Sequence, residues 1–201
     1  MEGKPSSRMI RSFVACPLDA GLVPRVVEVQ ERLREACADV KWVEPRNLHF
    51  TLKFLGEVDE GLISAMGEGL RGALKHHEAF TLEISGLGAF PSIAAPRVVW
   101  AGVGRGGTEL ESLARSIEDI AAGLGIPREK KGFSPHLTLG RVRSPRNLER
   151  LTRILRSEAP GVLGTMQVRE VVLMRSQLAG TGPTYSALLR IPLVAGTSVL
   201  C

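Results

Sequence analysis

The 201-residue chain lacks any apolar run near the roughly 20 residues needed to span a bilayer. Residues 1–11 are polar and basic, without the apolar stretch of a signal peptide. No linker rich in Gly, Ser or Pro divides the chain, which argues against independent domains. We therefore expect a single domain over residues 1–201, cytoplasmic and monomeric, with no membrane partner.

Cysteine is scarce, and its pattern excludes the usual cysteine-based frameworks. Cys16, Cys37 and Cys201 are odd in number and have no short metal-type spacing. Without an export signal, a disulfide framework has little support. We expect reduced thiols and no structural zinc site.

The composition is that of a globular protein with an anionic partner. Hydrophobic residues make up 44% of the chain and charged residues 23%, which is enough to bury a core. The net charge of +5 and a pI of about 9.5 favour a nucleotide or RNA as the partner.

Hydrophobic periodicity in the first half predicts strands over residues 9–18, 48–56, 80–90 and 97–103. A helix is expected after each of the first two strands. Asp59 is placed to cap the second helix. The apolar face of the first helix is expected to comprise Val26, Val27, Gln30, Leu33, Cys37 and Val40.

The second half begins with the clearest helical pattern. Thr108 and Glu111 have the spacing of a capping box, an apolar stripe follows, and Gly125 is expected to end the helix. A strand over residues 136–142 comes next, then a helix opened by Ser144 and Pro145. Strands near residues 165–174 and 184–193 complete the pattern.

The two halves repeat one order of elements. Each gives a helix, a strand containing one isolated histidine, a second helix and two strands. The order predicts an α+β fold with an internal repeat of approximately residues 22–104 and 108–193. The repeated units are expected to pack as two lobes of one domain.

Two short segments share the pattern His-x-Thr-x. They are His49-Phe50-Thr51-Leu52 and His136-Leu137-Thr138-Leu139. Residues two apart on a strand face the same way, about 6.5 to 7 Å apart, so each segment offers an imidazole and a hydroxyl on one face. Two such faces would form a cleft with four polar groups. The other two histidines, His76 and His77, are expected on the solvated surface.

These four groups match the needs of phosphodiester hydrolysis. An imidazole can act as acid or base because its ordinary pKa is about 6.5. Thr51 and Thr138 can donate hydrogen bonds to phosphate oxygens. One lone His-x-Thr would be read as a structural residue, and a metal site would need further ligands that neither segment contains. The pair favours chemistry that needs no metal or other cofactor.

The chain resembles the 2H phosphoesterase superfamily, and within it the RNA 2′,3′-cyclic phosphodiesterases, also called 2′-5′ RNA ligases. The similarity covers nearly the whole chain. Its main segments are RSFVA at residues 11–15, WVEPRNLHFTLKFLGEV at 42–58, GLGAFPSIAAPRVVW at 86–100, SPHLTLGRV at 134–142, residues 172–178, and Gly182-Pro183-x-Tyr185.

This resemblance implies two pseudo-symmetric lobes of mainly antiparallel sheet, with outer helices and a shared central cleft. It implies hydrolysis of RNA 2′,3′-cyclic phosphate ends to 2′-phosphomonoesters, with weak reverse 2′-5′ ligation of RNA. In that scheme His49 is the proton donor and His136 the proton acceptor. The expected partners are RNAs or nucleotides with cyclic phosphate ends.

Further substrate contacts are expected around the histidines. Arg141 has an odd offset from His136, so it would need a twist or bulge after Gly140 to reach the nucleotide, as the resemblance implies. Phe13 and Phe133 could stack on a base. Arg46 departs from the resemblance, since that position is more often acidic in the family.

Two alternatives remain at this point. Gly102, Gly104 and Gly107 formally fit a dinucleotide-binding G-x-G-x-x-G, but no suitable acidic residue or parallel βαβ unit follows, so we interpret them as a turn into a helix. The second alternative is a non-catalytic module that binds nucleotides or RNA on the same scaffold. The two histidines favour an enzyme, because a module that only binds phosphate needs hydrogen-bond donors but no groups that exchange protons.

Overall fold

A computed structural model describes residues 8–157, 161–180 and 182–195. Their strands form two antiparallel sheets. The first has the order β3 (His49–Val58), β1 (Ile10–Pro17), β8 (Glu170–Ala179), β9 (Gly182–Pro192). The second has the order β2 (Val40–Trp42), β6 (Leu137–Val142), β5 (Ala95–Val103), β4 (Phe80–Ser92), β7 (Val162–Val168). The expected α+β class is confirmed.

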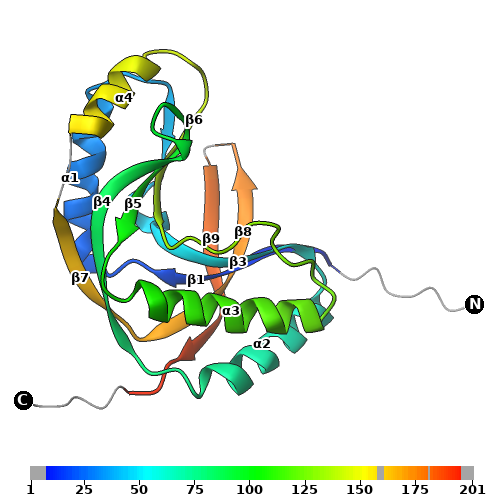
Figure 1. Cartoon of the computed structure of the whole chain (residues 1–201). Helices are drawn as coiled ribbons and strands as arrows, with labels where there is room; N and C mark the ends of the chain where they lie inside the picture. Colours follow the sequence, from blue (N-terminus) through cyan, green and yellow to red (C-terminus); the bar gives the residue numbers. More distant parts are fainter. Residues whose placement is uncertain (1–7, 158–160, 181, 196–201) are drawn as a thin grey trace, which may run out of the picture.

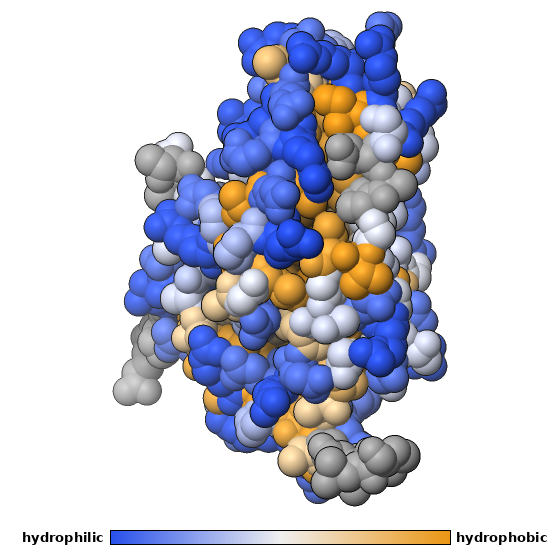
Figure 2. Space-filling view, turned by 90° about the vertical axis from the view of Figure 1, so that its left-hand side faces the viewer, coloured by the Kyte–Doolittle hydropathy of each residue, from blue (hydrophilic) through white to orange (hydrophobic). Residues whose placement is uncertain are grey.

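Helices cover the outer side of each sheet (Figure 1). α2 (Glu60–Leu74) and α3 (Gly107–Gly123) pack against β9 and β3 of the first sheet. α1 (Val23–Arg34) and α4 (Leu148–Ser157) pack against β7 and β5 of the second. The face that carries α1 and α4 is largely hydrophilic, with hydrophobic side chains showing in places between the polar ones (Figure 2). Within the described ranges, no helix is both long and apolar enough to cross a membrane.

Each sheet contains strands from both halves of the chain. The β4–β5 hairpin of the first half joins β6, while β8 and β9 of the second half join β1 and β3. One hydrophobic core therefore runs through both sheets. The two histidine segments, on β3 and at the start of β6, belong to different sheets, and these two strands contact each other. The proposed repeat boundaries stay a prediction.

Two helices are shorter than the sequence suggested. α1 ends at Arg34 because Cys37 adopts a φ of 52°, a left-handed conformation that no helix continues. Cys37 is consequently exposed, and Val40 starts β2 instead of extending the helical face. α4 begins at Leu148, after Asn147 with a φ of 56°, and not at Ser144 and Pro145.

The capping box predicted for α3 is wrong, although the predicted end of the helix is confirmed. Gly106, with a φ of 87°, precedes the helix and no side chain caps it. A Cβ at Gly106 would lie 2.4 Å from the Thr81 carbonyl oxygen, so only glycine fits this turn. At the other end Gly125 has a φ of 83°, and the Ile126 N–H donates to the Ala121 carbonyl at 2.9 Å in a Schellman motif.

The helix cap at Asp59, the segment near residues 165–174, His77 and the cysteines complete the comparison with the sequence. Asp59 caps α2 by accepting the Leu62 N–H at 2.8 Å, as predicted. The segment near residues 165–174 contains parts of two strands, β7 and β8, and not one. His77 is less solvated than expected, since its Nε2 lies 3.0 Å from the Ser116 hydroxyl. Cys16 is a buried free thiol, while Cys201 and residues 1–7 lie outside the described residues.

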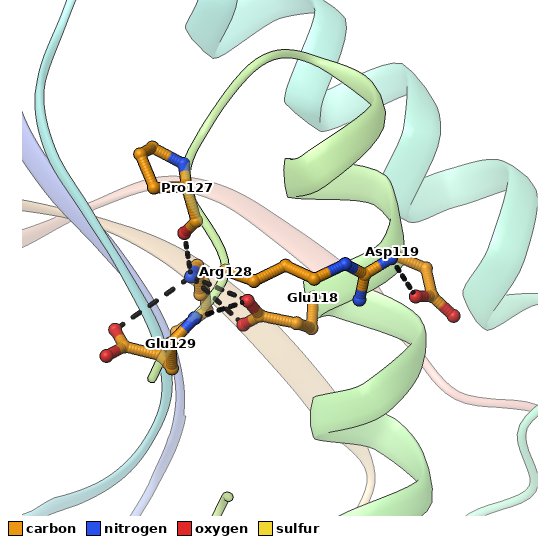
Figure 3. A network of polar contacts seen from close by, with 6 residues as sticks. Glu118, Asp119, Pro127, Arg128 and Glu129 are labelled. Carbon is orange, nitrogen blue, oxygen red and sulfur yellow. Dashed lines mark hydrogen bonds and ion pairs between the residues drawn. The ribbon is translucent and has the colours of Figure 1, made fainter. Parts of the chain in front are cut away.

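A buried lysine ties β3 to α3 and to the loop before His136. The Lys53 side chain is only 1% exposed, and its Nζ donates to Glu118 at 3.0 Å and to the Pro127 carbonyl at 2.9 Å. Glu129 lies 3.8 Å from the same Nζ and donates its backbone N–H to Glu118 at 2.8 Å. Figure 3 shows Glu118, Glu129 and the Pro127 carbonyl converging on this point. The network fixes the loop that leads to the second histidine.

We expect Lys53→Met to destabilise the fold by roughly 2 to 4 kcal/mol. Removing one partner of a buried ion pair costs about 3–5 kcal/mol, and Glu118 keeps some contact with water, which reduces the loss. The matched control is Arg128→Ala, which breaks the exposed 2.8 Å pair with Asp119 and should cost about 0.2–1 kcal/mol. Urea unfolding of both variants measures the difference. Equal losses would contradict an anchoring role for Lys53.

Candidate active site

Both His-x-Thr-x segments have the predicted alternation of faces. Phe50 is 1% exposed and packs in the core, while His49 and Thr51 are partly exposed. In the second segment the apolar residues, Leu137 and Leu139, are fully buried, and His136 and Thr138 are likewise partly exposed. The core thus holds each strand from behind, with the imidazole and hydroxyl on the opposite face.

The same backbone contact fixes both imidazole rings. His49 Nδ1 lies 2.7 Å from the Asn47 carbonyl oxygen, and His136 Nδ1 lies 2.7 Å from the Ser134 carbonyl oxygen. A carbonyl can only accept, so each Nδ1 carries the hydrogen. Nε2 is then the nitrogen that can exchange a proton in each ring. His49 Nε2 is 3.0 Å from the Thr51 hydroxyl, which donates to it when the ring is neutral.

Aromatic rings surround each imidazole. The Phe13 ring centroid lies 4.9 Å from that of His49, and Tyr185 meets His49 edge-on at 5.3 Å. Phe90 meets His136 edge-on at 5.0 Å. Phe13 is only 4% exposed, because its ring packs against His49. This burial argues against the expected role of Phe13 in stacking on a base. The Phe13 ring supports the imidazole and offers no open face.

Burial and charge favour neutral histidines. Burial lowers the pKa of His49, and the positive charges of Arg141 and His136 lower it further, while the hydrogen bond to the Asn47 carbonyl acts in the opposite direction. Burial also lowers the pKa of His136, again with Arg141 contributing. Arg141 therefore lies within electrostatic range of both rings.

A bulge in β6 explains how Arg141 reaches the histidine face. Trp100 pairs with Thr138 and Val99 with Gly140, so Leu139 is the extra residue. One extra residue reverses the alternation beyond it, which brings Arg141 to the side of His136. The bulge needed for the predicted role is present, one residue earlier than expected.

A buried glutamine donates a hydrogen bond to the carbonyl group of the bulged residue. The Leu139 carbonyl accepts hydrogen bonds from Gln30 Nε2 at 2.9 Å and from the Val43 N–H at 2.8 Å. Gln30 is 2% exposed and also donates to the Val43 carbonyl. This contact accounts for a polar residue on the apolar face of α1.

Sequence reasoning missed Phe54, which β3 presents in the corresponding way. Ala15 pairs with Thr51 and Val14 with Lys53, so Leu52 is bulged, like Leu139 in the second segment. The reversed alternation exposes Phe54 to 53% and buries Lys53. The only sequence signal was the same five-residue offset that separates Arg141 from its histidine.

A cavity of about 1010 Å³ joins parts of the two segments. Thr51, Phe54 and His136 line it, together with Phe133 from the preceding loop, so Phe133 is placed where a base could contact it. Thr138 is partly exposed on β6, but Thr138, His49 and Arg141 are not among the residues that line the cavity. Arg46 is exposed and forms a 2.7 Å ion pair with Glu44, away from the lining of the cavity. The cavity is large enough for a ligand of at least nucleotide size.

The geometry gives less support to a metal site or to a dinucleotide-binding glycine motif. Among the described residues, no three side chains of His, Cys, Asp or Glu gather as a metal ion would require. The G-x-G-x-x-G glycines lie where β5 turns into α3, and β5 is antiparallel to both of its neighbours, so they are not part of a parallel βαβ unit.

Comparison with known proteins agrees with the geometry. The sequence profile of the family described as LigT-like phosphoesterase matches residues 17–100 and 104–185. An RNA 2′,3′-cyclic phosphodiesterase from Methanothermobacter thermautotrophicus is 41% identical over 88% of this chain and 95% of its own length. One from Aeropyrum pernix is 38% identical over 85% of this chain and 96% of its own.

Solved structures show the same fold. A protein from Thermus thermophilus superposes with a TM-score of 0.78 at 28% identity, covering 92% of this chain and 99% of that one. Escherichia coli LigT in complex with 3′-AMP gives 0.74 at 27% identity, with the same coverage. The match over nearly the whole chain, together with the paired histidine segments, places this protein in the family of LigT-like phosphoesterases.

Proposed function

We propose that this protein is a hydrolase that opens 2′,3′-cyclic phosphates at RNA ends, with His49 and His136 as its acid and base. The observation that carries the proposal is the matched pair of imidazoles, each with Nδ1 on a backbone carbonyl and Nε2 left for proton exchange. The curated relatives named RNA 2′,3′-cyclic phosphodiesterase support the substrate class.

The reaction needs one proton removed and one supplied. His136 Nε2 takes a proton from water as the water oxygen attacks phosphorus. The bond between phosphorus and the 3′ oxygen breaks, and His49 donates its Nε2 proton to that oxygen. The products are a 2′-phosphomonoester and a free 3′ hydroxyl. Solvent exchange then returns both imidazoles to their starting states.

The remaining polar groups stabilise the phosphate. Thr51 and Thr138 donate hydrogen bonds to nonbridging oxygens, and Arg141 offsets the negative charge that develops on them. The bound anion also counteracts the effect of Arg141 on the pKa of His49, which favours the protonated acid in the complex. The base of the terminal nucleotide contacts Phe133, which directly precedes Ser134 on the loop that leads to His136. When the 5′ hydroxyl of another RNA end replaces water as the nucleophile, the same acid and base form a 2′-5′ phosphodiester and free the 3′ hydroxyl, which would allow weak joining of RNA ends.

We expect His49→Ala and His136→Ala each to lower kcat roughly 10²- to 10⁴-fold on a 2′,3′-cyclic nucleotide, in EDTA as well as without it. Circular dichroism and urea unfolding serve as controls for folding. Thr51→Ala and Thr138→Ala should each lose about 2 to 4 kcal/mol of transition-state stabilisation at most. Binding of the nucleotide by wild-type protein without turnover would favour the module that only binds. Full turnover in either histidine variant would exclude the two-histidine mechanism.

The pH dependence of kcat/KM should be bell-shaped, with its maximum below about pH 6.5. The base must be neutral and the acid protonated, so the maximum falls midway between the two macroscopic pKa values of the histidine pair. Burial lowers the pKa of both histidines, which moves both limbs to lower pH. Initial rates at limiting substrate across pH 4 to 9 measure the profile. A maximum above pH 7 would contradict the effect of burial.

A further inference from the structure

The cavity beside the histidines extends well beyond the groups that the reaction uses. From Thr51 and His136 it continues between the β4–β5 hairpin, one side of α3 and the loop over residues 127–135. We call this extension the α3 groove and define it by Phe54, Arg97, Arg115, Lys131 and Phe133. A single cyclic phosphate with its ribose needs only a small part of about 1010 Å³.

The α3 groove carries cations that the fold does not use. Arg97, Arg115 and Lys131 form no ion pair with the residues that the structure describes. The other cations of the lining are engaged, since Lys53 pairs with Glu118 and Arg128 with Asp119. Glu111 also lines the groove, one helical turn before Arg115, and reduces its positive charge without cancelling it.

Aromatic surface accompanies these cations. Phe54 is 53% exposed, and Phe133, from the loop before His136, is partly exposed in the same lining. Unpaired bases stack on such rings, and cationic side chains beside them track the phosphate backbone in proteins that bind single strands. Phe133 also packs partly against the core, whereas Phe54 gains little from burial because more than half of it is exposed. The combination fits single-stranded nucleic acid.

The chemistry of the substrate leaves one direction for the rest of the RNA. A 2′,3′-cyclic phosphate occupies both the 2′ and the 3′ oxygen of the terminal ribose, so the chain can leave the cleft only through the 5′ oxygen. We propose that the α3 groove binds the nucleotides on the 5′ side of the cyclic phosphate. Arg97, Arg115 and Lys131 contact their backbone phosphates, and Phe54 stacks on a base. This inference rests on the proposed function and makes RNA strands, not mononucleotides, the preferred substrate.

The test compares a 2′,3′-cyclic mononucleotide with short RNAs that end in the same cyclic nucleotide. For wild-type protein, kcat/KM should rise with RNA length until the groove is filled. In the double variant Arg115→Ala/Lys131→Ala, KM for the RNA should rise about tenfold, and the salt dependence of log KM should weaken by about 0.7 for each lost phosphate contact. Kinetics on the mononucleotide should stay within about twofold of wild type.

Arg150→Ala is the matched charge control. Arg150 is exposed on α4, which lies at the opposite end of the molecule from α3 in Figure 1, and it does not line the groove. An equal effect of Arg150→Ala would mean nonspecific attraction and would overturn the proposal. So would equal losses of the double variant on both substrates, or no preference of wild type for RNA. Failure of wild type to hydrolyse either substrate would instead refute the proposed function.

Discussion

The short hydrogen bond between each imidazole and the carbonyl two residues before it is the contact on which the site depends. It is 2.7 Å long at both His49 and His136, and it selects the tautomer in which Nδ1 carries the hydrogen and Nε2 can accept a proton. The carbonyls are themselves held. Asn47, which binds His49, is buried and donates its side-chain amide to the Pro183 carbonyl at 2.9 Å. The loop that carries the Ser134 carbonyl is anchored upstream by the Lys53 network. Two separate sets of contacts therefore position the two imidazole rings.

Matching bulges at Leu52 and Leu139 place different types of side chain beside the two histidine segments. Each bulge brings the residue five positions after the histidine onto the histidine face. In one strand that residue is Phe54 and in the other Arg141. The same kind of bulge therefore places an aromatic ring on the histidine face of β3 and a positive charge on that of β6. The two strands thus differ at this position although their His-x-Thr-x segments are alike.

Much of this arrangement could be predicted from local sequence, and the rest depends on contacts that local patterns do not encode. The alternation of His49 and Thr51 against Phe50 follows from strand geometry, as do the cap at Asp59 and the stop at Gly125. The exposed Phe54 was missed because a bulge reverses the alternation without any change in composition. Thr108 failed as a cap because Gly106 had already turned the chain into the helix. The exchange of hairpins between sheets involves pairing far apart in sequence, which element order alone cannot decide.

In the proposed mechanism, a fixed acid and a fixed base act on one particular phosphorus–oxygen bond. The most direct test is ³¹P NMR of the product formed from a short RNA ending in a 2′,3′-cyclic phosphate, in EDTA. With His49 as the acid for the 3′ oxygen, we expect a single product, the 2′-phosphomonoester. A 3′-phosphate, or a mixture of both isomers, would contradict it.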